Sequence, residues 1–303
     1  MNRFIRFIKD KVRNFIGINI LKSIRDLIIS HQTIERQKKH PNPLNAFGKK
    51  CFSQSDEDGI TLEILKRIGI KKGVYGEFGC GNGYENNTLA LVASGWKGFW
   101  VGGVKLRFNY KNTKNFNFNK HWITKENAIE LYNNGLEKIN EKKLDLFSID
   151  LDGNDIYILE ELLKKVELPK VIIAEYNSKF FPPLTFRIKY DPNHIWGVDD
   201  YLGASLSEFV KVLDKYSYKL VCCNSGTGAN AFFVKNEFAN EFNDVPKDIN
   251  QIYVEARYQI LSETGNGHKP SVKTIERIFE QLEENNFIKL SKKCMSIFFT
   301  TTF

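Results

Sequence analysis

Glycines at alternate positions follow one apolar stretch of the chain, and this pattern strongly constrains the fold. The segment 73–83 reads Gly-Val-Tyr-Gly-Glu-Phe-Gly-Cys-Gly-Asn-Gly, so that Glu77 is followed by Gly79, Gly81 and Gly83. Glycine adopts positive φ readily and lets a ligand approach the backbone with no Cβ in the way. An apolar run after the loop predicts a helix. Strand, glycine loop and helix in this order are typical of the nucleotide-type site of an α/β sheet, although an ordinary tight turn can also use such glycines.

The spacing of these glycines bears on which cofactor the loop can take. The dinucleotide fingerprint is G-x-G-x-x-G, which places a pyrophosphate on the following helix. Tyr84 occupies the third glycine position of that fingerprint, and Gly83 comes one residue early. The spacing therefore disfavours a nicotinamide oxidoreductase.

Composition indicates a globular protein. The 303 residues are 42% hydrophobic and 26% charged, which is enough for one large α/β domain with additions. The net charge is +8, but acids and bases alternate along most of the chain. A nucleic-acid binder should cluster its basic residues, so nucleic acid is not an expected partner.

Cysteine spacing and the lengths of the apolar stretches bear on the location of the protein. None of the five cysteines forms a C-x-x-C pair, which argues against a zinc site or a disulfide framework. The chain has no apolar stretch close to 18 residues. The expected location is the cytoplasm.

The N-terminal segment 1–40 differs from the rest. Apolar residues at roughly 3.6-residue spacing alternate with arginine and lysine from Met1 to about Ser30, which predicts a basic amphipathic helix. Such a helix suits the inner face of an anionic membrane. It equally suits packing on its own domain or in a homo-oligomer.

Alternating strands and helices predict a Rossmann-like, doubly wound, mostly parallel seven-stranded sheet that ends in an antiparallel hairpin. The domain should cover 50–237, with a helical C-terminal extension over 238–303. The predicted strands are 74–78, 98–101, a third near 121–124, 145–149, 171–175, 218–223 and 230–235. Helices are expected around 248–262 and 272–285 in the extension.

Carboxylates follow two neighbouring strands of the predicted sheet. Asp150 and Asp152 follow the fourth strand, and Glu175 and Asn177 follow the fifth. Because ligands of open α/β sheets bind at the carboxyl ends of the strands, these groups should converge. Like charges this close favour a cation, and hard oxygen ligands suit Mg²⁺ or Mn²⁺. The alternative is that the aspartates cap the next helix.

Several short motifs in order give the chain a resemblance to a known family. It resembles the FkbM-like group of class I S-adenosylmethionine (SAM) methyltransferases, many of which methylate hydroxyls of sugars or glycans. The motifs are Phe52-Ser-Gln-Ser-Asp-Glu-Asp-Gly59, the segment from Glu77 to Asn87, Gly95-Trp-Lys-Gly-Phe-Trp100, Ser148-Ile-Asp-Leu-Asp-Gly-Asn-Asp155, Glu175-Tyr-Asn177, Gly203-Ala-Ser-Leu206 and Asn230-Ala-Phe-Phe-Val234.

The resemblance implies SAM as cofactor and a sugar hydroxyl of a bacterial surface glycan, or its nucleotide-linked precursor, as acceptor. Glu77, the acid of the glycine motif, would bind the amino-acid end of SAM. The cofactor-binding residues implied are Gln54, Glu77, Gly79, Gly81, Gly83, Asn87, Gly102, Asn127 and Asp150. The acids also resemble the ion site of metal-dependent O-methyltransferases, in which Asp150, Glu175 and Asn177 would hold the metal and Asp150 would be catalytic.

The sequence departs from the family pattern at the second strand. Most class I methyltransferases hold the ribose with an acid there, but the segment 100–105 reads Trp-Val-Gly-Gly-Val-Lys. The ribose of SAM would therefore have to be held by other groups. The missing acid also supports an alternative function, a non-catalytic glycan-assembly partner that retains the fold.

An insert at 180–203 follows the fifth strand and is expected over the acceptor side of the site. It contains His194, whose pKa near neutrality suits a general base. The alternative is a surface histidine with no role.

Overall fold

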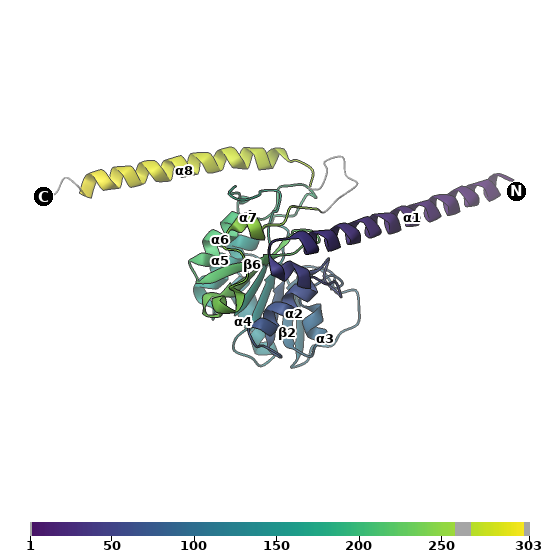
Figure 1. Ribbon diagram of the computed structural model, residues 1–303, viewed down its shortest axis with the longest axis horizontal. Coiled ribbons are helices and arrows are strands. Elements are labelled where there is room, and N and C mark those ends of the chain that lie inside the picture. Colours follow the sequence, from purple (N-terminus) through teal and green to yellow (C-terminus); the bar gives the residue numbers. More distant parts are fainter. Residues whose placement is uncertain (1, 258–267, 300–303) are drawn as a thin grey trace.

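The computed structural model describes residues 2–257 and 268–299, with side chains described for residue 17 and for residues 19–257 and 268–285. A seven-stranded sheet forms the centre of the body, and two long helices project from it in different directions (Figure 1). The strands are β1 (Val74–Phe78), β2 (Lys97–Gly102), β3 (Phe116–Lys120), β4 (Leu146–Ile149), β5 (Val171–Glu175), β6 (Tyr218–Cys223) and β7 (Asn230–Lys235). The α-helices are α1 (Asn2–Lys39), α2 (Glu57–Arg67), α3 (Leu89–Ala93), α4 (Ala128–Lys138), α5 (Asp155–Lys165), α6 (Leu206–Asp214), α7 (Ile249–Ile252) and α8 (Val272–Phe299).

The strand order is β3-β2-β1-β4-β5-β7-β6. Strands β1 to β5 pair in parallel, and β7 is antiparallel to both β5 and β6. The chain reverses its direction across the sheet between β1 and β4, which is the point where open α/β sheets bind ligands. The predicted fold class is confirmed, including the antiparallel hairpin at the end.

The third strand lies five residues earlier than predicted, at Phe116–Lys120 instead of near 121–124. Its two phenylalanines decide this, because Phe118 is buried and Phe116 packs edge-on against Trp100 with ring centroids 5.0 Å apart. The segment 121–124 therefore lies beyond the carboxyl end of β3, where ligand-binding residues are expected.

The C-terminal extension also differs from the prediction. The helix expected around 248–262 is the short α7, Ile249–Ile252, and residues 258–262 lie outside the described part of the chain. The second helix, α8, is longer than expected. Phe242, Ile252 and Val254 belong to the main hydrophobic core, so this part of the extension packs directly on the body.

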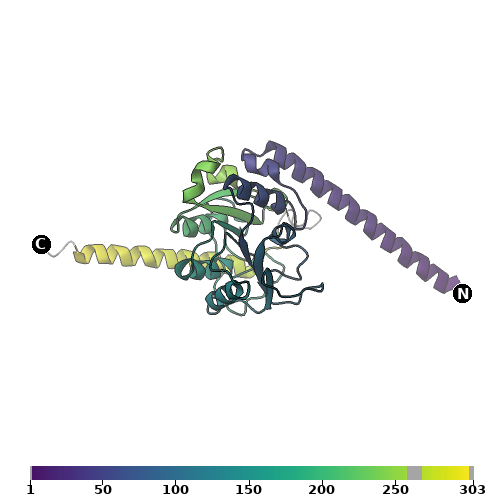
Figure 2. The same ribbon diagram turned by 90° about the horizontal axis from the view of Figure 1, so that it is seen from below.

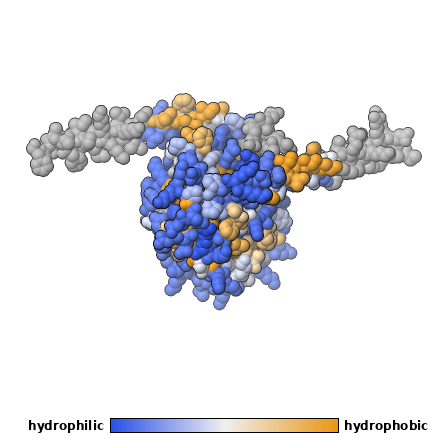
Figure 3. Space-filling model, viewed as in Figure 1, coloured by the Kyte–Doolittle hydropathy of each residue, from blue (hydrophilic) through white to orange (hydrophobic). Residues whose placement is uncertain are grey.

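Helix α8 is attached to the body by polar contacts. Thr274 Oγ1 donates to Asp200 Oδ1 at 2.7 Å, and Arg277 Nε donates to the Arg187 carbonyl at 3.0 Å. The apolar side chains at four positions of the same helix stay 39–63% exposed, namely Ile275, Ile278, Phe279 and Leu282. Figure 3 shows this apolar surface beside a mostly hydrophilic body.

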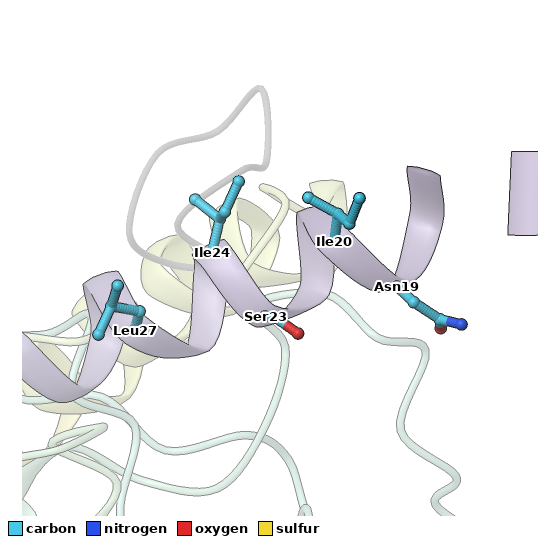
Figure 4. Close-up of a pocket in the computed structure, with 5 residues that line it drawn as sticks. All are labelled: Asn19, Ile20, Ser23, Ile24 and Leu27. Atoms are coloured by element: carbon cyan, nitrogen blue, oxygen red, sulfur yellow. The ribbon is translucent and has the colours of Figure 1, made fainter. Parts of the chain in front are cut away.

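Helix α1 also exposes an apolar stripe. Ile20, Ile24 and Leu27 are 48–69% exposed, and their side chains lie along one side of the helix, with Asn19 and Ser23 turned away from it (Figure 4). The second view confirms that most of α1 stands clear of the body (Figure 2). Within the described residues no helix is long and apolar enough to cross a membrane. Binding of α1 to a membrane surface stays a prediction.

Candidate functional site

The glycine loop after β1 is held against the loop after β4. Gly79 has a φ of +93°, and a Cβ at this position would lie 1.5 Å from the Asp150 carbonyl oxygen. Its N–H donates to the Val101 carbonyl at 2.9 Å, which also ties the loop to β2. Gly81 and Gly83 have φ values of +48° and +87°. The first glycine is therefore required by close backbone contact, and the other two by their backbone conformation.

Glycines also fill the end of β2, where the usual acid is missing. A Cβ at Gly102 would lie 2.7 Å from the Cys80 sulfur, and one at Gly103 would lie 3.2 Å from the indole ring of Trp122. The space that an acidic side chain would need at Gly102 is thus taken by Cys80. A ribose held here would meet backbone groups.

These loops enclose a recess of about 60 Å³ at the carboxyl ends of β1, β2 and β4. Its lining residues are Gly79, Gly102, Gly103, Trp122, Ile123, Leu151, Asn154 and His194. Three of the predicted site residues, Gly79, Gly102 and His194, thus come together here. Pockets for small molecules usually measure 300–1,000 Å³, so a cofactor the size of SAM requires the recess to open.

The insert after β5 covers this recess. Trp122 Nε1 donates to the Pro192 carbonyl at 2.8 Å, and Asn154 Nδ2 donates to the Asp191 carbonyl at 2.7 Å. Farther out, the Tyr190 hydroxyl binds the Glu126 carboxylate. These contacts draw the insert across β4 towards the end of β3.

His194 reaches the recess from this insert. Its ring lies against Gly153, where a Cβ would come within 2.3 Å of Cδ2. Burial lowers the pKa of His194, which favours the neutral imidazole at pH 7. Nε2 is buried with no hydrogen-bond partner. The histidine is therefore poised to accept a proton at the recess.

Glu77 lies beneath the glycine loop with its carboxylate fully engaged. Oε1 accepts from the Asn87 N–H at 3.1 Å and Oε2 accepts from the Thr88 hydroxyl, at the start of α3. Trp100 Nε1 in turn donates to the Thr88 hydroxyl oxygen at 2.8 Å. Burial raises the pKa of Glu77 to about 7. In this arrangement Glu77 fixes the loop and the helix start.

Asn87 joins this buried layer to other strands. Its side-chain Nδ2 lies 3.2 Å from the Ser148 hydroxyl and 3.3 Å from Asn230 Oδ1. The predicted cofactor residue Asn87 thus links β4 and β7 below the loop.

Two other predicted cofactor residues, Gln54 and Asn127, do not line the recess. Gln54 is exposed in the loop before α2. Asn127 Oδ1 accepts from the Thr124 N–H at 2.8 Å, and Nδ2 donates to the Trp122 carbonyl at 2.9 Å. Asn127 therefore shapes the turn that places Trp122 and Ile123.

Three predicted metal ligands do come together. Asp150, Asp152 and Glu175 each offer a carboxylate oxygen, and these oxygens lie within 4.8 Å of one another. Burial and the neighbouring acids raise the pKa of Asp150 and of Glu175 well above their usual values, and the two side chains are hydrogen-bonded to each other. Such a pair shares a proton at neutral pH.

The same donor set fits a divalent cation. Three carboxylates supply hard oxygen ligands, and a bound cation would displace the shared proton and remove the repulsion. Asp155 stands next to them and is occupied, since its two oxygens accept from the N–H groups of Leu151 and Gly153 at 2.7 and 2.9 Å. That bonding holds the 150–155 loop in shape.

Asn177 is used differently from the prediction. Its Nδ2 donates to the carbonyl oxygens of Asp200 and Leu202, both at 3.0 Å, and its Oδ1 accepts from the Lys179 N–H at 3.2 Å. The side chain is buried and ties the start of the insert to its end. Its role in the structure is therefore to close the base of the insert.

The sequence did not single out Trp122, Ile123, Leu151, Asn154 or Gly103 as lining residues. Trp122 and Ile123 follow β3 directly, so the rule that ligands bind at the carboxyl ends of strands would have found them had β3 been placed correctly. Leu151 and Asn154 lie in the predicted acidic motif, but only as spacers between its acids.

No protein-family model matches the chain, and no curated protein matches its sequence. Solved structures resemble it weakly. A precorrin-6y C5,15-methyltransferase from Geobacter metallireducens shares 12% identity over 57% of this chain and 76% of its own, with a TM-score of 0.30. A proposed hemolysin from Streptococcus thermophilus shares 15% identity over 68% and 74%, with a TM-score of 0.39.

A glycopeptide N-methyltransferase bound to S-adenosylhomocysteine shares 13% identity over 63% of this chain and 95% of its own, with a TM-score of 0.35. Likenesses at this level do not distinguish one activity from another. The functional argument therefore depends on the site itself.

Proposed function

We propose that the chain is a SAM-dependent methyltransferase that transfers the methyl group to a hydroxyl of a carbohydrate. One observation carries this proposal: a single loop, 150–155, supplies both the recess and the acid cluster. Leu151 and Asn154 line the recess, whereas Asp150 and Asp152 belong to the cluster. A cofactor in the recess and an acceptor at the acids would thus be neighbours.

SAM bound in the recess would supply an electrophilic methyl group on a sulfonium. The backbone of Gly79, Gly102 and Gly103 would lie against the cofactor, because no Cβ blocks its approach. The Trp122 indole and the Ile123 side chain offer apolar surface for its base. Closing of the insert would exclude water from the recess.

The acids would serve the acceptor. The Asp150–Glu175 pair can take the hydroxyl proton as the oxygen–carbon bond forms and the carbon–sulfur bond breaks, leaving S-adenosylhomocysteine. If Mg²⁺ or Mn²⁺ binds, Asp150, Asp152 and Glu175 would hold it, and the ion would lower the pKa of the hydroxyl. In either case the chain mainly positions the two reactants.

The carbohydrate acceptor follows from the sequence resemblance. A bacterial surface glycan or its nucleotide-linked precursor is the substrate class we propose, with the cytoplasm as the place of reaction.

Calorimetric titration with SAM and with S-adenosylhomocysteine tests the first step. We expect binding by the wild-type chain and weaker binding by Gly103→Ala, whose Cβ would enter the recess next to Trp122. Gly17→Ala, in α1 with no atom within 4 Å of its Cβ, is the matched control. Absence of binding up to millimolar SAM by a folded protein would rule out the enzyme and favour the non-catalytic partner.

A second assay tests the acceptor. Production of S-adenosylhomocysteine is measured with nucleotide sugars and glycan fragments, and with amino-sugar analogues that replace one hydroxyl by an amine. Turnover of the hydroxyl compounds supports O-methylation, whereas turnover of the amines alone would contradict it.

A further inference from the structure

A second pocket, of about 390 Å³, lies at the base of α1, away from the recess and the acids. It is formed where the last turns of α1 pack on the loop between β6 and β7 and on the chain after α7. Its lining residues are Gln32, Glu35, Arg36, Lys39, His40, Pro41 and Arg257. The pocket is shallow and widely open to solvent.

Arg36 is held firmly at one side of this pocket. Its Nη1 donates to the Ser225 carbonyl at 2.6 Å, which fixes the guanidinium plane. Nη2 is buried and has no hydrogen-bond partner. Burial and the nearby positive charge of Arg257 both lower the pKa of Arg36, which shows that the two guanidinium groups disfavour each other.

Arg257 faces Arg36 from the other side. Its Nη1 donates to Gln32 Oε1 at 3.2 Å, while Nε is buried without a partner. The Glu255 carboxylate, 3.7 Å from Arg257 Nη2, is mostly exposed and therefore a weak counter-charge. At this pocket, Arg36 Nη2 and Arg257 Nε are therefore both hydrogen-bond donors without an acceptor.

The charge of the lining is positive. Arg36, Lys39 and Arg257 are cationic, against Glu35 alone. His40 adds no charge: its Nδ1 accepts from the Asn42 N–H, its Nε2 lies 3.3 Å from the Tyr253 carbonyl oxygen, and burial lowers its pKa. Counting the Glu255 carboxylate beside Arg257 leaves a net +1, which favours an anionic ligand.

We propose that this pocket binds a phosphate or diphosphate group. Planar guanidinium groups bind phosphate oxygens bidentately, and a phosphate or diphosphate offers two of them more charge and more acceptor oxygens than a simple carboxylate does. Phosphate also supplies acceptor oxygens for the unpaired nitrogens.

Buried hydrogen bonds link the loop beside the pocket to the β5–β7 ladder. Ser225 and Gly226 donate their N–H groups to Asp56, and Asn224 donates to Glu57, whose Oε1 also accepts from Asn230 Nδ2. Asn230 in turn stands opposite Glu175 in the β5–β7 ladder. This part of the inference rests on the proposed function: the anion is the phosphate of a phosphorylated acceptor.

Calorimetry with inorganic pyrophosphate at low ionic strength, without SAM, tests the pocket. We expect binding by the wild-type chain and at least 10-fold weaker binding by Arg257→Gln. Arg36→Lys keeps the charge but loses the bidentate geometry, and should also weaken binding. Lys38→Gln is the control, because it removes the same single positive charge as Arg257→Gln, from a side chain two residues after Arg36 that does not line the pocket.

Absence of binding at 10 mM pyrophosphate, or equal weakening by Arg257→Gln and Lys38→Gln in folded proteins, would overturn the proposal. Uridine diphosphate and vesicles with phosphatidic acid then distinguish the sources: preference for the first indicates a nucleotide-linked acceptor, and preference for the second a lipid-linked one. Pyrophosphate binding without SAM binding would leave the pocket standing while the methyltransferase proposal fails.

Discussion

The β1–β2 side of the site is built from backbone, whereas the β4–β5 side is built from side chains. On the first side the chain removes side chains, with Gly79, Gly102 and Gly103 at the recess. On the second side it places three carboxylates within 4.8 Å of one another. The first side depends on backbone approach and tolerates little added volume, whereas the second depends on charge and tolerates little loss of acidity. The comparison predicts different failures when each is changed.

The largest effect is expected at the contact between the two sides. Gly79→Ala places a Cβ 1.5 Å from the Asp150 carbonyl oxygen at a positive φ, so we expect a loss of about 3 kcal/mol or more in the free energy of unfolding. Urea denaturation measures it. Gly81→Ala, also at positive φ but in open space, should lose only about 1 kcal/mol. Equal losses would show that the contact with Asp150 is not what requires glycine.

The next effect separates binding from chemistry. Asp150→Asn should reduce methyl transfer about 10²–10⁴-fold, the usual contribution of a general base, while SAM affinity changes little. Release of S-adenosylhomocysteine and calorimetry give the two values. Asp152→Asn, at a φ of +55° that asparagine adopts easily, tells the roles apart. A mild effect favours the proton-sharing pair alone, and an equally severe effect favours a metal held by all three acids.

A third prediction concerns pH. The pKa of Glu77 is raised to about 7 by burial, from an ordinary value of 4.5. Between pH 4.5 and 7 the unfolded chain has lost this proton while the native chain retains it, so the stabilisation is complete below pH 4.5 and disappears as pH rises through 7. Glu77→Gln should remove up to about 3 kcal/mol of that pH dependence. Denaturant titrations at pH 5 and 8 test this, with exposed Glu130→Gln as the control; an unchanged pH dependence would contradict it.

The smallest effect is expected at the cover of the recess. Trp122→Phe removes the hydrogen bond to the Pro192 carbonyl, which is worth about 1 kcal/mol. Because the insert then opens at a lower cost in free energy, SAM should bind about 5-fold more tightly. Calorimetry compares the two proteins. Weaker binding would mean instead that the indole ring contacts the cofactor more than it holds the cover.

The sequence predicted those parts of the site that depend on local order. Gly79 and Asp150 directly follow strands, Asp152 lies three residues after β4 and Glu175 ends β5, and parallel strands bring their carboxyl ends to one edge. Asn177 could not be predicted in this way. Its amide is engaged by the backbone of Asp200 and Leu202, which returns to it only through the folding of the insert.

The misplaced third strand has a similar explanation. The segment 116–120 reads Phe-Asn-Phe-Asn-Lys, and asparagine has low strand propensity, so propensity alone does not predict a strand here. Packing of Phe116 on Trp100 outweighs that propensity.

Helix α1 carries both an apolar stripe and Arg36 on one continuous rod. Leu27 and Arg36 are nine residues apart, or about 14 Å along the axis. Burying each of Ile20, Ile24 and Leu27 would yield about 1.5–3 kcal/mol that a single chain does not obtain. A surface that covers the stripe therefore binds the same helix that carries Arg36 at one wall of the anion pocket. By thermodynamic linkage, the factor by which docking of the stripe raises the affinity for the anion equals the factor by which the anion raises the affinity for docking.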